Sequence, residues 1–132
     1  MTDYVIDASV LVMVIGGREA AADDLRARFP TIGRHAPHLI DAEVGNVLRR
    51  HESAGLMGED ECIAGLAALP SLIDHRYPHT GPLAETAWRL RGNLSFYHAL
   101  YVALAAHLGT PLLSADARLA RAPDLPCQLE LV

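Results

Sequence analysis

The chain of 132 residues contains no lysine, only two cysteines and few aromatic residues, and these scarcities narrow what it can be. Cys62 and Cys127 lie far apart and match no CxxC or zinc-ligand spacing, which predicts free thiols in a reducing compartment. No apolar run has the length of a membrane span and the first residues lack a signal-peptide pattern, so we expect a cytoplasmic protein without membrane contact. The net charge of −5 argues against broad adhesion to nucleic acid, but it leaves room for a small metal site that acts on nucleic acid.

Three missing motifs exclude classes that share an apolar first strand ending in a carboxylate, which here runs from Tyr4 to Asp7. A phosphotransferase of the haloacid-dehalogenase type needs a second Asp two residues later, where this chain has Ser9. A response-regulator receiver needs a lysine. A dinucleotide-binding domain needs GxGxxG directly after the strand, and Gly16-Gly17 comes too late and predicts a helix end instead.

Apolar strands alternate with helical patterns along the whole length, which predicts one domain over residues 1–132. Strands are expected over residues 3–6, 38–40, 72–77, 111–114 and 128–132, and helices over residues 8–15, 18–29, 41–54, 59–69, 83–92, 96–108 and 116–121. Pro30 and Pro70 are expected to end the second and fourth helices. Short connections between alternating elements predict an α/β fold, with a parallel sheet covered on both faces.

The predicted helix over residues 96–108 has almost no polar face, because residues 99–106 are nearly all apolar. A helix that is apolar all round is buried. We therefore expect it to lie between the sheet and either another helix or a second subunit.

Three carboxylates follow predicted strands. Asp7 and Asp116 each come after an apolar strand, and Glu43 begins a helix that follows one, so all three are expected at the carboxyl edge of the sheet. Singly, each has a structural explanation as a helix cap or a first-turn acid. Together they repel one another unless a cation holds them, and oxygen-rich sites suit Mg²⁺ or Mn²⁺. Such a metal can activate water and neutralise charge on a phosphate.

Neighbouring polar residues are candidates for support. Ser9 and Ser114 could hold a carboxylate or a metal-bound water, or cap helices. Asn46 follows Glu43 by about one turn and either lines the site or lies on the surface. Arg50 has a helical position near Glu43 and is the candidate for contact with a phosphate group.

Four segments, in this order and spacing, resemble the PIN-domain ribonucleases and, within them, the VapC-type toxins of bacterial toxin–antitoxin pairs. They are Tyr4-Val5-Ile6-Asp7-Ala8-Ser9 and residues 41–50, 94–105 and 112–120. The resemblance implies a three-layer α/β/α sandwich, the PIN domain, and Mg²⁺- or Mn²⁺-dependent cleavage of structured RNA such as tRNA or rRNA, with Asp7, Glu43 and Asp116 at the metal. It also implies a homodimer, and a VapB-type antitoxin whose amphipathic helix lies in a groove and reaches the acidic site with a basic residue.

One position departs from the family pattern. Where these toxins usually carry a further acid, this chain has His98, at position N3 of a helix that Ser95 would cap. His98 could bind the metal as a neutral imidazole and favour Mn²⁺. It could instead contact the scissile phosphate or transfer a proton, or the site could be weakened because an acid is missing. The structural alternative is an ordinary half-buried histidine. The alternative function is therefore a PIN-like module that binds RNA or a partner without cutting.

Overall fold

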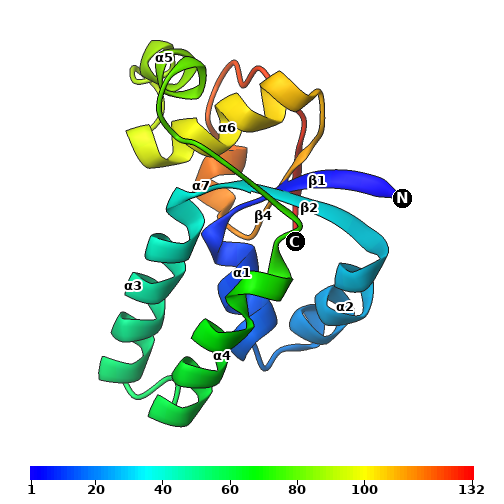
Figure 1. Ribbon diagram of the computed structural model, residues 1–132, viewed down its shortest axis with the longest axis vertical. Coiled ribbons are helices and arrows are strands. Elements are labelled where there is room, and N and C mark those ends of the chain that lie inside the picture. Colours follow the sequence, from blue (N-terminus) through cyan, green and yellow to red (C-terminus); the bar gives the residue numbers. More distant parts are fainter.

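The computed structural model describes residues 1–132 and contains one sheet of five parallel strands with helices on both faces (Figure 1). The strands, in the spatial order β3-β2-β1-β4-β5, are β1 (Thr2–Ile6), β2 (Ile32–Pro37), β3 (His75–Tyr77), β4 (Leu112–Ser114) and β5 (Leu129–Leu131). The helices are α1 (Ala8–Gly16), α2 (Ala20–Arg28), α3 (Leu39–Ser53), α4 (Glu59–Leu72), α5 (Pro82–Arg89), α6 (Phe96–Leu108) and α7 (Ala117–Ala120), with a short 3₁₀ helix η1 (Phe29–Thr31). The parallel, doubly covered sheet is as predicted.

The central strand β1 is buried because the sheet is covered on both faces. Helix α6 packs against β1, β2 and β4 together with α5, while α1 to α4 lie on the opposite face, as Figure 1 shows. Tyr4, Val5 and Ile6 are accordingly buried. Every residue of α6 from 99 to 105 is buried between the sheet and α5, which confirms the prediction of a buried helix with another helix as its cover.

The strand predicted at residues 38–40 is wrong. The second strand lies six residues earlier, at Ile32–Pro37, and residues 39 and 40 already belong to α3. The segment Ile32-Gly33-Arg34-His35-Ala36-Pro37 has no apolar run, so its strand character was not visible. It is a strand because its backbone pairs with both β1 and β3, and such tertiary pairing overrides local propensity.

Pro70 does not end the fourth helix, which continues to Leu72. The proline is exposed and lies in the last turn of α4, where its missing N–H removes one intrahelical hydrogen bond. The remaining predicted elements exist with shifted ends; the third strand, for example, covers only His75–Tyr77.

None of the helices combines the length and the apolar character that a bilayer crossing requires. Both cysteines are free thiols, with Cys62 buried and Cys127 half-buried. The ends of β1 and β4 lie side by side in the sheet, because Ile6 pairs with Leu113, and this adjacency brings the residues after both strands together.

Candidate active site

Asp7 lies directly after β1 and is the N-cap of α1. One carboxylate oxygen accepts hydrogen bonds from the Val10 N–H at 3.2 Å and from the Ser9 hydroxyl, and the other accepts from the Ser114 hydroxyl. The side chain is therefore both a cap and a buried acid, with only 4% of the residue exposed. Burial raises the pKa of Asp7, against the opposing effect of the Ser114 and Ser9 hydrogen bonds.

Glu43 lies in the second turn of α3, which begins at Leu39 and not at residue 41, so the prediction of a first-turn acid is wrong. Its half-buried side chain lies at the margin of the buried stripe, as predicted. The Tyr101 hydroxyl, from α6, donates a hydrogen bond of 2.6 Å to its Oε1. Burial raises the pKa of Glu43, and this hydrogen bond partly offsets the rise. Tyr101 is only 1% exposed and its own pKa is raised by burial, so it is a permanent donor to Glu43.

Asp116 lies just past β4 and is itself the N-cap of α7, accepting from the Arg118 backbone N–H at 2.9 Å. The Ser114 hydroxyl accepts from the Asp116 N–H at 3.0 Å, so Ser114 supports the turn but is not the predicted cap. Both carboxylate oxygens of Asp116 also receive the Arg118 guanidinium, at 3.1 and 3.0 Å. These hydrogen bonds with Arg118 lower the pKa of Asp116. The Arg118 side chain is 79% exposed, so it is free to leave.

His98 stands at the start of α6, where Ser95 caps the helix by accepting from the His98 N–H at 3.2 Å, as the sequence predicts. The ring Nε2 lies 3.6 Å from Oδ2 of Asp116. His98 is therefore beside the acids and not turned away from them.

These side chains share one opening, which we call the acid cavity. It has a volume of about 450 Å³. Its polar lining comes from α1, α3, α6, α7 and their caps: Asp7, Ser9, Glu43, Arg50, His51, His98, Tyr101, Asp116 and Arg118. The structure thus brings together the three predicted acids, His98, Ser9 and Arg50.

Two predicted supporting residues lie elsewhere. Ser114 is fully buried beneath the cavity and acts through its contact with Asp7. Asn46 is exposed, accepts a hydrogen bond from Arg49 at 3.2 Å and does not line the cavity. Sequence reasoning gave no role to Tyr101, because a tyrosine in an all-apolar helix looks like core, and its partner Glu43 is 58 residues away.

The donor set fits a divalent cation, since three carboxylates and an imidazole border one cavity. As the side chains stand, no three His, Cys, Asp or Glu residues are close enough together to hold an ion. Each acid is instead occupied by protein donors: hydroxyls for Asp7, Tyr101 for Glu43, and Arg118 for Asp116. A cation would have to draw the carboxylates together and displace Arg118.

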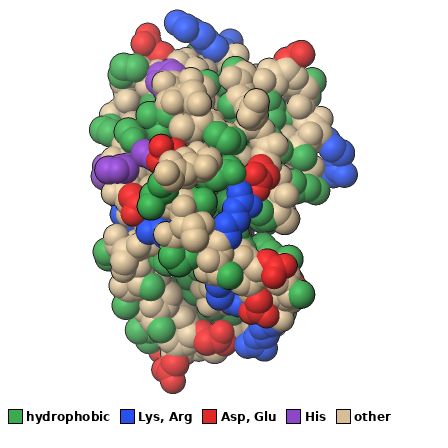
Figure 2. Space-filling model, turned by 90° about the vertical axis from the view of Figure 1, so that its right-hand side faces the viewer, with side chains coloured by type: hydrophobic (Ala, Val, Ile, Leu, Met, Phe, Trp, Pro, Cys, Tyr) green, Lys and Arg blue, Asp and Glu red, His purple; other side chains and the backbone are tan.

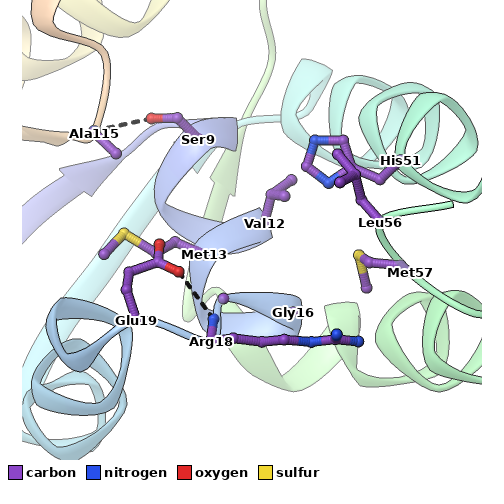
Figure 3. Close-up of a pocket in the computed structure, with 11 residues that line it drawn as sticks. Ser9, Val12, Met13, Gly16, Arg18, Glu19, His51, Leu56, Met57 and Ala115 are labelled. Carbon is purple, nitrogen blue, oxygen red and sulfur yellow. Dashed lines mark hydrogen bonds between the residues drawn. The ribbon is translucent and has the colours of Figure 1, made fainter. Parts of the chain in front are cut away.

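A second opening continues from the acid cavity, and we call it the apolar groove. It has a volume of about 370 Å³ and shares Ser9, Val12, His51 and Ala115 with the acid cavity. Figure 3 shows side chains of α1 facing those of the α3–α4 connection across it, among them Leu56 and Met57. Its full lining is Ser9, Val12, Met13, Gly16, Gly17, Arg18, Glu19, His51, Leu56, Met57 and Ala115.

Comparison with known proteins gives matches over nearly the whole chain. The family model described as PIN domain matches residues 4–125. Ribonuclease VapC1 of Mycobacterium tuberculosis is 49% identical over 132 residues, which are 100% of this chain and 99% of the relative. Ribonuclease VapC12 of the same organism is 33% identical over 129 residues, covering 97% and 98% of the two chains.

Solved structures share the fold. VapBC2 from Rickettsia felis, solved with a DNA fragment from its promoter, aligns with a TM-score of 0.71 at 12% identity over 99% of each chain. Mycobacterium tuberculosis VapC20, described as a sarcin–ricin loop cleaving toxin, aligns with a TM-score of 0.69 at 16% identity over 89% of this chain and 92% of that one. The three-layer α/β/α architecture expected from the sequence is confirmed.

Proposed function

The chain belongs to the PIN domain family, and from this we propose that it is a VapC-type toxin, an endoribonuclease that hydrolyses phosphodiester bonds in structured RNA and is neutralised by a VapB-type antitoxin. The observation that carries the proposal is the acid cavity, which Asp7, Glu43 and Asp116 line together at the carboxyl edge of the sheet. Its support from outside the structure is the 49% identity to a protein named as a ribonuclease over the whole chain. The site of action is the cytoplasm.

Asp7, Glu43 and Asp116 would hold the divalent ion, Mg²⁺ or Mn²⁺. When bound, the ion activates a water molecule and neutralises charge on the phosphate. Ser9 and Ser114 keep the Asp7 carboxylate in one orientation by donating to its two oxygens. Tyr101 does the same for Glu43. Burial of Asp7 and Glu43 destabilises their charged forms and raises their pKa values, so a bound cation would stabilise both carboxylates by replacing the lost hydration.

His98 and Arg50 act on the substrate side of the cavity. His98 Nε2 borders Asp116 and is placed to contact the scissile phosphate or to move a proton at that ring nitrogen. Arg50 lines the same cavity from α3 and has no carboxylate partner, so its guanidinium is available to a phosphate. We assign His98 to catalysis and leave the metal to the three acids.

The substrate class is structured RNA such as tRNA or rRNA. Support comes from the fold shared with VapC20, whose description names the sarcin–ricin loop.

The antitoxin partner fits the apolar groove. An amphipathic helix could place apolar side chains against Val12, Leu56 and Met57, and the groove leads directly into the acid cavity. A basic residue from such a helix would meet the carboxylates there. We expect Leu56→Asp to weaken inhibition by the antitoxin while cleavage of RNA by the free toxin stays intact, because Leu56 is 60% exposed and contributes little to the core.

The proposal includes a homodimer. Large apolar side chains remain exposed on α4, α5 and the start of α6, including Ile63, Leu66, Trp88 and Tyr97. Light scattering on the antitoxin-free protein measures the mass directly, and a monomer at all concentrations would remove the dimer from the proposal.

The test is cleavage of a panel of structured RNAs by purified, antitoxin-free protein with Mg²⁺, Mn²⁺ or chelator, beside Asp7→Asn. Asn is as good an N-cap as Asp and keeps the size of the side chain, so the fold is retained. Cleavage that chelator and Asp7→Asn both abolish establishes a metal nuclease. Cleavage that survives both contradicts the proposal. A gain in Mg²⁺-supported activity with His98→Asp would show that the histidine weakens a site built for an acid.

The second candidate function is a PIN-like module that binds RNA or a partner without cutting. One observation favours it: the acids are engaged by protein donors, and no three metal-binding side chains are close together. It predicts that Asp7→Asn, Glu43→Gln and Asp116→Asn leave function unchanged. The nuclease proposal predicts loss of cleavage and of toxicity from each.

A further inference from the structure

The eleven arginines are the only strong cations of the chain, and they fall into two groups. Six form ion pairs with carboxylates: Arg18, Arg26, Arg28, Arg34, Arg76 and Arg118. On the face that carries α2, acidic and basic side chains lie next to one another (Figure 2). The other five arginines, which are Arg49, Arg50, Arg89, Arg91 and Arg121, have no carboxylate within ion-pair distance.

Arg121 is the unpaired arginine with the most specific setting. It follows α7 and lines a hollow of about 280 Å³ that we call the arginine hollow. Asn93, Ser95, His98 and Arg118 supply the rest of its polar lining, and no Asp or Glu borders it. Arg118 is paired with Asp116, so Arg121 is the one unpaired arginine of an opening that no acid lines, in a chain of net charge −5.

The arginine hollow is continuous with the acid cavity, because His98 and Arg118 line both. An RNA strand whose scissile phosphate lies among the acids must carry its neighbouring phosphate along the protein surface. The arginine hollow offers that phosphate a guanidinium, an amide and a hydroxyl, which are the donors that proteins use for backbone contacts.

The apolar groove on the other side of the acid cavity is less suited to a phosphate. Its arginine, Arg18, is paired with Glu61, and Glu19 lies beside it. The two openings therefore differ in chemistry: one suits an apolar helix and the other suits a polyanion.

We propose that the arginine hollow is a phosphate-binding subsite for the RNA substrate, in which Arg121, with Asn93 and Ser95, contacts the backbone phosphate next to the scissile one. This inference rests on the proposed ribonuclease function. Arg121 is exposed and holds no other part of the chain by an ion pair, so its side chain is free for a ligand and its replacement leaves the fold intact. Arg118 forms an ion pair with Asp116, so Arg121 is the arginine of the hollow that is available to the phosphate.

The experiment measures RNA binding by the full chain carrying Asp7→Asn, so that binding is read without cleavage. The probes are bulk tRNA and a short fluorescent oligouridylate, titrated over a series of salt concentrations. We compare Arg121→Gln with Arg49→Gln, which removes the same charge from an exposed arginine of α3 that lines neither opening. Arg121→Lys serves as the conservative variant.

Arg121→Gln is expected to weaken binding several-fold and to reduce the slope of log K against log salt by about 0.7 to 0.9, the change for one lost phosphate contact. Arg49→Gln is expected to leave the slope unchanged, and Arg121→Lys to restore it. Equal slopes for all variants, or equal losses at residues 121 and 49, would overturn the subsite. If the chain with Asp7 intact cleaves RNA in either of those cases, only the subsite fails; if it neither binds nor cleaves RNA, the proposed function fails with it.

Discussion

Two carboxylates, one hydrogen-bonded to a side chain of β1 and one directly after that strand, are held in opposite ways. Glu130 of β5 receives the guanidinium of Arg28 and the hydroxyl of Tyr4, and the hydrogen bond with Arg28 lowers its pKa. Asp7, at the end of β1, receives two hydroxyls and one backbone N–H, and burial raises its pKa. The first acid has its cation within the fold; the second has only neutral hydrogen-bond donors.

The same contrast recurs within one helix. On α3, Asp41 forms a two-pronged ion pair with Arg76, at 2.8 and 3.0 Å. Glu43, two residues later, receives only the Tyr101 hydroxyl. An acid with an arginine partner fixes the structure, whereas a buried acid with neutral donors carries uncompensated charge that a cation from outside can neutralise. Asp116 is intermediate, because its arginine is exposed and removable.

The largest expected difference is between Glu43→Gln and Asp41→Asn. Glu43→Gln should lower RNA cleavage by at least about 100-fold, because even indirect supports of a metal cost about 10- to 100-fold. Asp41→Asn should leave cleavage within roughly threefold, since it changes a half-buried ion pair that does not line the acid cavity, and should cost about 1 kcal/mol of stability. Initial cleavage rates and urea unfolding of both variants measure this. Comparable losses of cleavage in the two variants would contradict the assignment of Glu43 to the active site and of Asp41 to the structure.

Tyr101→Phe tests whether the neutral donor positions Glu43. The variant keeps the aromatic ring in the core and removes only the hydroxyl that donates to Glu43. We expect cleavage and metal affinity to fall by about tenfold, the range for a residue that orients a ligand. Calorimetric titration with Mn²⁺ separates this role from packing. Unchanged Mn²⁺ affinity with lowered stability would assign Tyr101 to the core alone.

Arg118→Ala tests the intermediate case. Arg118 covers both oxygens of Asp116, so removing it should raise Mn²⁺ affinity in the absence of RNA by about two- to fivefold, the value of an exposed ion pair. Arg89→Ala removes the same charge from an arginine that lines neither the acid cavity nor the arginine hollow, and serves as control. Equal increases in Mn²⁺ affinity in the two variants would show that the effect comes from the change in net charge alone.

The sequence predicted those elements whose structure is determined by their own residues. The first strand and α6 were visible because burial on all sides leaves apolar runs, as in Tyr4 to Ile6. β2 was missed because its strand character comes from pairing on both edges and not from its own side chains. Helix ends were displaced where a proline stands near a helix end, as at Pro70 in α4.

The candidate site was predictable to the extent that topology places it. Parallel strands align their carboxyl ends, so Asp7 and Asp116 could be paired from their strand positions alone, and the structure places both in one cavity. The hydrogen-bond partners of the acids were not predictable, because Tyr101 reaches Glu43 across 58 residues and Ser114 reaches Asp7 across 107. Such contacts depend on how each helix is positioned on the sheet to within one turn, and the hydrophobic periodicity of the sequence does not determine that position.

The smallest expected effect is on the stability of the metal-free protein against pH, and here the two kinds of acid should differ in sign. The folded-state pKa of Asp7 is raised, so its stabilising contribution is present at low pH and is lost as the pH rises through that pKa. The folded-state pKa of Glu130 is lowered, so its contribution is present near neutrality and is lost as the pH falls through that pKa.

Asp7→Asn should therefore gain stability relative to the parent as the pH rises toward neutrality, while Glu130→Gln should lose stability there. For Glu130, which is partly exposed, the loss should be about 1 kcal/mol or less, and it should vanish on acidification. Urea unfolding in chelator over a pH series measures both differences. Adding Mn²⁺ should then stabilise the parent and Glu130→Gln but not Asp7→Asn, because only the acid without an internal cation gains from one supplied from outside. Destabilisation of both variants at neutral pH, with the same response to Mn²⁺, would mean that Asp7 is as structural as Glu130.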